Sequence, residues 1–324
     1  MQIDPQHHRL LYRVAQAYYM DGLTQREIAE RFGLSRPKVS RLLQQARDVH
    51  VVNISLVPPS EGAADLEHDL EVTYGLEEAV LVDVHHPAQP ELVARDLGPP
   101  AAACLLRRLT RSSVVAMAWG RTLWATIEAL PARTMPDVTV VQLSGGLGPV
   151  DALEHSTELI RRAAQKLNAK LRLLPAPGIV STLDAAQALR QDHQVAEVLK
   201  LAARADIAVV GLGVPTPDSV LLKDGTILTA DDLRLLEANG AVGDIALRYI
   251  DAQGETVSLD RLNQRIIGLS LDTIRCIPTV IGVGGGTVKH EVVKAALKSG
   301  LLDVLVTDRD TAEAVLSETQ SEDT

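Results

Sequence analysis

Cysteines and long apolar runs are scarce in this chain. Two cysteines, Cys104 and Cys276, occur among 324 residues, far apart and without CxxC spacing. A disulfide framework is therefore excluded, as expected for a reducing cytosol, and we expect both side chains in the core. The apolar runs are broken too often by Gly, Pro or charged residues to span a bilayer, and no signal peptide is recognisable. The sequence predicts a cytoplasmic protein that does not interact with a membrane.

An overall excess of basic charge is also missing, although the charge is unevenly distributed. The formal net charge is −10, yet residues 1–57 hold eight Lys and Arg against five Asp and Glu, and the remaining residues hold 24 against 37. A nucleic-acid partner is therefore expected only near the N-terminal end, because the acidic remainder repels DNA. With 46% hydrophobic residues, the chain is long enough for one small and one large domain.

A helix-turn-helix pattern lies at residues 24–43. Thr24 and Glu27 have the spacing of a capping box, so the first helix is predicted to begin there. Gly33 suits the left-handed conformation that ends a helix, and Ser35 is placed to cap a second helix with Pro37 in its first turn. A leading helix over residues 8–20 is expected to complete a three-helix domain.

The second helix of this pattern has an apolar face and a polar face. Apolar residues recur at helical spacing on the inward face at Val39, Leu42, Leu43 and Ala46. On the opposite face, Arg and Gln side chains can read base edges, and Lys, Arg and Ser can bind phosphates. A solvated helix is the alternative, but two caps, a glycine turn and a polar face together favour binding to double-stranded DNA. The predicted DNA-binding residues are Ser35, Arg36, Lys38, Ser40, Arg41 and Gln44.

The dipeptide Pro58-Pro59 marks a domain boundary, and the β-branched run at residues 50–57 predicts a short strand or wing before it. We therefore expect a DNA-binding domain at 1–57, a linker with an oligomerisation helix at 58–78, and a large domain at 79–324. In the linker, Leu66, Leu70 and Tyr74 are spaced four residues apart. This spacing suits pairing with a second copy of the helix.

Apolar segments alternate with amphipathic helices from residue 79 onward. Such alternation predicts an α/β fold in which a parallel sheet is covered on both faces. Strands are expected at 79–84, 114–119, 138–143, 171–175, 206–213, 276–286 and 301–308. Helices are expected at 92–109, from 122, from 153, up to 204, at 288–298 and after 308. The tail after Ser317 is expected to be disordered.

Glycine-rich loops follow four of the expected strands, where α/β sheets bind their ligands. Glycine N–H groups and helix dipoles favour an anion, and Lys289 adds positive charge. Each loop alone is explained by turn geometry, but together they predict a site for a phosphorylated small molecule. The loop residues are Gly120, Arg121 and Thr122, then Gly145 and Gly146, then Gly211 and Gly213, and finally Gly284, Gly285 and Gly286.

Several other kinds of site are excluded by the sequence. No GxGxxG with a following acidic residue and no P-loop is present, so neither a dinucleotide cofactor nor a nucleoside triphosphate is expected. No HExxH motif or Cys cluster occurs, so no metal is expected either. Asp244 is a candidate for binding sugar hydroxyls, and the capping of a loop is an equally good interpretation of it.

The chain resembles SorC-type bacterial transcriptional regulators, the group that includes the deoxyribonucleoside and central glycolytic gene regulators. The resemblance covers nearly the full length and rests on the helix-turn-helix and on several motifs. These are AWGRTL, QLSGG, LLPAPG, GLG, VGDI and VGGGTVKHEVVKAALKSGLLDVLVTD. The resemblance implies a Rossmann-like effector domain similar to sugar-phosphate isomerases and deaminases, a phosphorylated sugar as effector, and a homodimer or homotetramer.

By the same resemblance, Gly120, Arg121 and Thr122 would hold the effector phosphate together with Gly145 and Gly146. Lys289 would neutralise the phosphate, and Asp244 would contact hydroxyls. Leu247 departs from the family pattern, which commonly has a small residue there, and it predicts a narrower pocket. Nothing in the resemblance implies a catalytic residue.

The leading hypothesis is a transcription factor whose binding to operator DNA is controlled by a phosphorylated sugar. The alternative is an enzyme, a sugar-phosphate isomerase or deaminase fused to a DNA-binding head. A third interpretation is an acidic scaffold protein with an inactive head. Conversion of sugar phosphates distinguishes the enzyme from the regulator, and lack of sequence preference on DNA distinguishes the scaffold.

Overall fold

The computed structural model describes residues 5–49, 51–52, 63–146, 150–215, 228–257 and 260–322. The chain divides into two compact units, Met1–Pro59 and Ser60–Thr324, called here the head and the body. Each unit has its own hydrophobic core. The predicted strand or wing at 50–57 lies mostly outside the described residues.

The head consists of three helices, α1 (Pro5–Tyr19), α2 (Gln25–Phe32) and α3 (Arg36–Asp48). The predicted capping box is confirmed, because the Thr24 N–H donates to Glu27 Oε2 over 2.8 Å and the Glu27 N–H donates to Thr24 Oγ1 over 3.3 Å. Gly33 ends α2 in the left-handed conformation with φ of 65°, as predicted. The prediction for Ser35 is only half right: it precedes α3, but its side chain makes no capping hydrogen bond.

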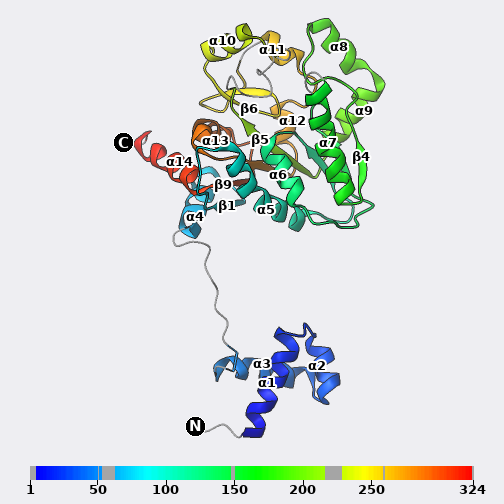
Figure 1. The fold of residues 1–324 in the computed structure, drawn as a ribbon, viewed down its shortest axis with the longest axis vertical. Coiled ribbons are helices and arrows are strands. Elements are labelled where there is room, and N and C mark those ends of the chain that lie inside the picture. Colours follow the sequence, from blue (N-terminus) through cyan, green and yellow to red (C-terminus); the bar gives the residue numbers. More distant parts are fainter. Residues whose placement is uncertain are drawn as a thin grey trace. The chain divides into compact units, whose positions relative to one another are not determined.

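The body contains the predicted parallel sheet (Figure 1). Its parallel strands have the spatial order β1-β9-β8-β5-β2-β3-β4. Their bounds are β1 Glu78–Val82, β2 Val114–Met117, β3 Thr139–Gln142, β4 Lys170–Arg172, β5 Ile207–Gly213, β8 Thr279–Val283 and β9 Val304–Asp308. The sheet centre consists of buried β-branched and aliphatic residues, which is the composition of a parallel sheet with both faces covered.

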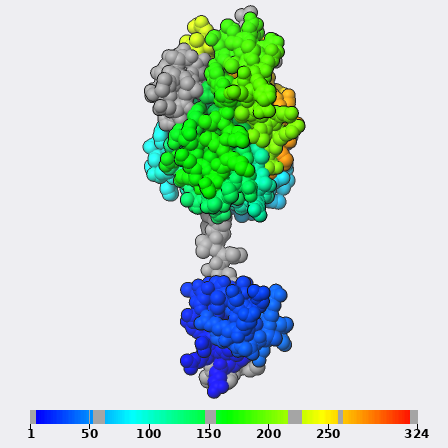
Figure 2. Space-filling view, turned by 90° about the vertical axis from the view of Figure 1, so that its right-hand side faces the viewer, coloured from blue at the N-terminus to red at the C-terminus, as the bar shows by residue number. Residues whose placement is uncertain are grey.

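Helices cover both faces of this sheet. The connections from β1 to β4 run toward the β4 edge of the sheet, and those from β4 to β9 run back toward β1. Because such crossovers are right-handed, α5, α6 and α7 lie on one face. Helices α9, α12 and α13 lie on the other face. Helices α7 to α9, green in Figure 2, form much of the surface on the β4 side. The bounds are α4 Ala63–Tyr74, α5 Pro90–Arg108, α6 Arg121–Ala129, α7 Val150–Lys166, α8 Leu183–Gln191, α9 His193–Ala202, α12 Leu271–Arg275, α13 His290–Lys298 and α14 Arg309–Glu322.

An antiparallel hairpin was not anticipated by the sequence pattern. It consists of β6 (Ala241–Ile245) and β7 (Arg248–Asp251), and β6 pairs antiparallel with the end of β5. Together with α10 (Ala230–Ala238) and α11 (Asp260–Arg265), the hairpin has a separate small core. This small lobe lies beside the carboxyl edge of the sheet, because Gly213 at the end of β5 pairs with Asp244 in β6.

Three expectations about individual segments are corrected by the structure. The tail expected to be disordered after Ser317 is wrong in part, because α14 continues to Glu322. Cys104 is buried as expected, but Cys276 is exposed because it follows the short helix α12 at the surface. In α4, Leu70 is buried in the core of the body. This residue, which was expected to pair with a second copy of the helix, therefore packs within its own chain.

No helix in the described part of the chain is both long and apolar enough to cross a membrane.

Because the two units have separate cores, the body alone is expected to fold. A fragment of residues 60–324 should unfold within about 2 °C of the body transition in the full chain, since the loss of a 1 kcal/mol contact shifts Tm by about that much in a domain this large. Differential scanning calorimetry of the fragment and the full chain measures both transitions. A fall of 10 °C or more in the fragment would show that the head contributes to the stability of the body.

Candidate functional site

Helix α3 presents the predicted DNA-binding residues to solvent. Its apolar residues Val39, Leu42, Leu43 and Ala46 are buried against the rest of the head, as predicted. The opposite face carries the predicted set, all of it exposed: Ser35, Arg36, Lys38, Ser40, Arg41 and Gln44. A helix of this kind, anchored by one face and polar on the other, has the form that enters a major groove.

Gln44 and Arg41 differ in how far they are free to contact a base. The Gln44 amide donates to Asp48 Oδ1 over 2.9 Å and accepts from Arg47 Nη2 over 2.5 Å, while Arg47 also donates to the Tyr19 hydroxyl over 3.0 Å. Both ends of the Gln44 amide are therefore engaged within the head. Among the described residues, Arg41 has only a long contact of 3.4 Å from Nε to the Pro37 carbonyl. Arg41 is thus the side chain of this pair that is free to read a base edge.

The carboxyl edge of the sheet gathers the glycine loops. Strands β8, β5 and β2 are neighbours, so the loops that follow them lie next to one another. Gly120 and Arg121 follow β2, Gly211 and Gly213 end β5, and Gly285 follows β8. The structure therefore places residues from three distant segments of the sequence at one edge, as the fold class requires.

Asp244 reaches this edge through the β6–β7 hairpin. A Cβ atom on Gly213 would lie 2.2 Å from Asp244 Oδ1, so only glycine permits this close approach. Asp244 Oδ2 accepts a hydrogen bond of 3.0 Å from the Leu247 N–H. The hairpin turn places Ala246 and Leu247 at positive φ, 51° and 72°, which is unfavourable for residues with a Cβ. The Leu247 side chain packs in the small-lobe core, so it does not narrow the effector site as predicted.

Lys289 and Asp244 form an electrostatic pair at the centre of the site. Burial lowers the pKa of Lys289 to about 8, against the opposing attraction of Asp244 and with the nearby positive charge of Arg121 adding to the effect. Burial likewise raises the pKa of Asp244 to about 6, although its hydrogen bond to Leu247 and the charge of Lys289 oppose this. At neutral pH both groups are mainly charged, and no hydrogen bond to a described residue occupies the Lys289 ammonium.

The start of α6 supplies further donors. Gly120 precedes the helix with φ of 141°, and no side chain caps the helix N-terminus. The first-turn N–H groups therefore have no partner of their own within the helix. Arg121 pairs with Glu91 Oε1 over 3.0 Å, and both side chains are mostly exposed. Thr122, in the first turn of α6, is buried.

Gly145 and Gly146 do not present free amides. The Gly145 N–H donates to the Ile267 carbonyl over 2.9 Å, and the Gly146 N–H donates to the Ala176 carbonyl over 3.0 Å. A Cβ on Gly145 would lie 2.5 Å from the Ala176 and Pro177 oxygens, so this glycine is explained by close backbone packing. Both amides therefore have partners within the fold, and the assignment of Gly145 and Gly146 to the effector phosphate stays a prediction.

The loop of Gly285 and Gly286 rests on Asp308, a residue that the sequence did not single out. Asp308 is 1% exposed and lies at the end of β9. Its carboxylate accepts from the Gly286 N–H over 2.6 Å and from the hydroxyl and N–H of Thr311 over 2.7 and 3.0 Å. A Cβ on Gly285 would lie 2.1 Å from Asp308 Oδ2. Gly285 and Gly286 are therefore needed for this carboxylate to hold the loop that leads to Lys289.

The chain matches two family models. Residues 59–317 match the model described as "Putative sugar-binding domain", and residues 7–49 match region 4 of sigma-70. The chain is 36% identical to the transcriptional regulator LsrR of Enterobacter sp. (strain 638), over 95% of this chain and 93% of that protein.

Solved structures of transcriptional regulators are also similar to this chain. The full-length sorbitol operon regulator SorC from Klebsiella pneumoniae is 26% identical with a TM-score of 0.72, covering 96% of this chain and 99% of that one. A DeoR family transcriptional regulator from Listeria monocytogenes is 30% identical with a TM-score of 0.71, covering 79% of this chain and 100% of that one.

A helix-turn-helix head joined to an α/β body with converging loops defines the class of ligand-responsive, DNA-binding transcriptional regulators. Within this class, the chain belongs to the SorC family of sugar-responsive transcriptional regulators. Its relatives named above are regulators rather than enzymes.

The position of Asp308 predicts a role in effector binding. Asp308→Ala removes the carboxylate, so the Gly286 N–H and the hydroxyl and N–H of Thr311 all lose this acceptor, at a cost of at least about 1.5–3 kcal/mol in the free energy of unfolding. Because the carboxylate holds the Gly286 loop, effector affinity should also fall about 10-fold, measured by isothermal titration calorimetry.

Asp303→Ala is the matched control. Asp303 accepts the Val280 N–H over 2.7 Å at the opposite end of the same part of the sheet. This variant should lose stability but retain effector affinity. Equal losses of affinity in both variants would assign Asp308 a purely structural role.

The free Arg41 side chain leads to a prediction about DNA. Arg41→Ala should reduce affinity for the operator by about 1–3 kcal/mol and affinity for random DNA much less, since a base contact carries sequence information. Fluorescence anisotropy at several salt concentrations measures both, and Gln44→Ala serves as the comparison. Equal losses on both DNAs would make Arg41 a phosphate contact.

Proposed function

We propose that a phosphorylated sugar binds at the carboxyl edge of the body sheet and controls the affinity of the head for operator DNA. The observation that carries this proposal is the Lys289 ammonium. It is desolvated enough to lower its pKa to about 8, and no hydrogen bond to a described residue occupies it. An anionic group beside the Lys289 ammonium would offset the free-energy cost of its desolvation, so the site favours an anion.

The phosphate group is best accommodated at the start of α6. The uncapped N–H groups there and the positive end of the helix dipole favour an anion, and Arg121 lies in the first turn. The charge of Arg121 already acts on Lys289, so both cations contribute positive charge to the same site. Arg121 would exchange its exposed ion pair with Glu91, worth about 0–1 kcal/mol, for the phosphate.

Asp244 is suited to the sugar moiety. Its Oδ2 is used by the Leu247 N–H, which leaves acceptor capacity on the carboxylate for sugar hydroxyls. Gly213 keeps the end of β5 free of a side chain beside this group. A carboxylate for hydroxyls and two cations for phosphate together match a sugar phosphate better than a neutral sugar.

Control of DNA binding requires that the effector binds one arrangement of the protein better than another. A nearly complete switch needs about a 10⁴-fold difference in affinity, roughly 5.5 kcal/mol. We propose a homo-oligomer, because two heads bind two half-sites of a palindromic operator and their spacing can be changed by the bodies. Leu70 is buried within its own chain, so we propose an interface that does not use this residue.

A catalytic role is the second candidate, because Asp244 and Lys289 have pKa values near 6 and 8, which suit proton transfer. We propose that the effector is bound without conversion, in line with the regulators to which the chain is related. Incubation of the purified protein with a panel of sugar phosphates, followed by ³¹P NMR, distinguishes the two: new phosphorus signals would favour the enzyme.

Lys289 provides the test of the effector site. Lys289→Ala removes a charge-assisted contact of roughly 1.5–3 kcal/mol, so the affinity for a sugar phosphate should fall about 10- to 150-fold. DNA binding without effector should be nearly unchanged. Titration of effector against operator-bound wild-type and variant protein measures both quantities, and an unaltered effector response would contradict the assignment.

The pH dependence of effector binding is a second measurement on Lys289. With a pKa of about 8, its ammonium is mostly protonated at pH 7 and mostly neutral at pH 9. A sugar phosphate remains dianionic over this range, so affinity should fall about 10-fold from pH 7 to pH 9. Lys289→Met should abolish this dependence, whereas a slope that survives in the variant would come from another group.

A further inference from the structure

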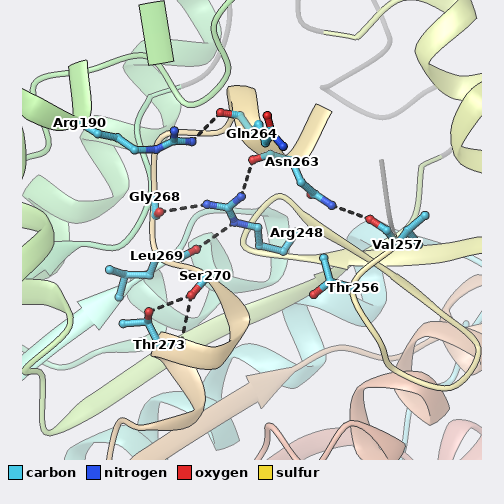
Figure 3. A pocket seen from close by; sticks show the side chains of 10 residues that line it. All are labelled: Arg190, Arg248, Thr256, Val257, Asn263, Gln264, Gly268, Leu269, Ser270 and Thr273. Carbon is cyan, nitrogen blue, oxygen red and sulfur yellow. Dashed lines mark hydrogen bonds between the residues drawn. The ribbon is translucent and has the colours of Figure 1, made fainter. Parts of the chain in front are cut away.

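A second pocket lies in the small lobe, apart from the predicted effector residues. It has a volume of about 620 Å³ and is formed by β7, the ends of α8 and α11, and the segment that leads into α12 (Figure 3). None of its lining residues is acidic, and two are arginines. The ten lining residues are Arg190, Arg248, Thr256, Val257, Asn263, Gln264, Gly268, Leu269, Ser270 and Thr273.

Arg248 is buried at the base of this pocket, and no carboxylate of a described residue pairs with it. Its side chain donates to the carbonyls of Leu269, Asn263 and Gly268 over 3.0, 2.7 and 3.0 Å. The residue is 8% exposed. Burial, with a smaller contribution from the positive charge of Arg190, lowers the pKa of Arg248 to about 10, so it remains charged at neutral pH. A buried charge that contacts only neutral groups is unfavourable.

Arg190 brings a second positive charge to the same segment. Its Nη2 donates to the carbonyls of Gln264 and Ile266 over 2.6 and 2.9 Å. Figure 3 shows both guanidinium groups directed at the chain between Asn263 and Leu269. These bonds hold the segment that follows α11, which explains why the arginines are there. They do not compensate two positive charges, because every acceptor is a neutral carbonyl.

The two guanidinium groups retain donors for a ligand. Two such groups carry ten N–H donors, and five are used by the carbonyls described. Hydroxyl groups of Thr256, Ser270 and Thr273 also line the pocket. The pocket therefore offers unused donors and two positive charges within a volume that admits a small molecule.

We propose that this pocket is a second anion site, which binds a phosphate group between Arg190 and Arg248. A phosphate dianion matches two positive charges, whereas a single carboxylate matches one, and the planar guanidinium fork fits phosphate oxygens. The phosphate group belongs either to inorganic phosphate or to a phosphorylated metabolite. This pocket and the proposed effector site are distinct, because the two share no residue.

The pocket also adjoins the effector site through the hairpin. Arg248 begins β7 and Asp244 lies in β6, on either side of the turn at Ala246 and Leu247. An anion at Arg248 would contact the same hairpin that places Asp244. Occupancy of the second site is therefore expected to alter effector affinity without contact between the two ligands.

Binding of inorganic phosphate by the full chain tests this proposal. Isothermal titration calorimetry is carried out in a phosphate-free buffer at constant ionic strength. Lys289→Ala removes the main cation of the effector site, and phosphate binding should persist in this variant. Addition of Arg190→Gln to Lys289→Ala should weaken the remaining binding at least about 10-fold.

Arg234→Gln is the matched control, because Arg234 is exposed, ion-paired with Asp231, and outside the pocket. Combined with Lys289→Ala, it should leave phosphate binding unchanged. Tighter binding of a sugar phosphate than of phosphate in Lys289→Ala assigns the site to a metabolite, and equal binding assigns it to inorganic phosphate. Absence of phosphate binding in Lys289→Ala, or binding that Arg190→Gln leaves intact, would overturn the proposal.

A measurement on the protein without a pocket substitution covers the case in which Arg190→Gln fails to fold. Crystals of Lys289→Ala grown without phosphate are soaked in phosphate and compared with unsoaked crystals. New density beside the Arg190 and Arg248 guanidinium groups is expected. Density confined to other parts of the molecule would overturn the proposal.

Discussion

The parallel alignment of β8, β5 and β2 is the constraint on which the effector site depends. β5 lies between the other two strands, and Val209 pairs with Met117 on one side and with Ile281 on the other. Parallel strands that share a register end at the same edge, so the loops after them converge whatever their separation in sequence. Lys289, Arg121 and the glycines of β5 therefore meet, although they belong to three distant segments.

The backbone donors at this edge are mostly used by the fold itself. The amides of Gly145 and Gly146 donate to carbonyls, and the amide of Gly286 donates to the buried Asp308 carboxylate. An anion gains most where donors lack partners, because satisfied donors must first break a bond. The uncapped start of α6 is such a place, and the Lys289 charge lies nearby. The site is thus narrower than the row of glycine loops suggests.

The β6–β7 hairpin connects this edge to the small lobe. Its turn holds Ala246 and Leu247 at positive φ, which costs of order 1–3 kcal/mol per residue. The hydrogen bond from Leu247 to Asp244 and the burial of Leu247 in the small-lobe core offset that cost. The same hairpin carries Asp244 at the proposed effector site and Arg248 at the pocket of the small lobe. A change in the conformation of the hairpin would therefore alter the positions of both Asp244 and Arg248.

The sequence by itself determined the features that depend on neighbouring residues. The Thr24–Glu27 capping box, the Gly33 turn and the buried face of α3 involve contacts within a few positions, and all are present. The alternation of apolar strands and helices likewise determined the parallel sheet, because a strand buried on both faces must be apolar along its length.

Only the tertiary structure decided contacts between distant segments. Asp308 holds the Gly286 loop, Asp244 occupies the space that a Gly213 side chain would need, and Arg248 reaches the carbonyls after α11. No local pattern marks Asp308 or Arg248, since each acts on a backbone group many positions away, and the contact of Asp244 with Gly213 also joins distant segments. The glycines show the same limit: the sequence placed Gly145 and Gly285 at loops, but only the fold showed that neighbouring atoms leave no room for a side chain at either position.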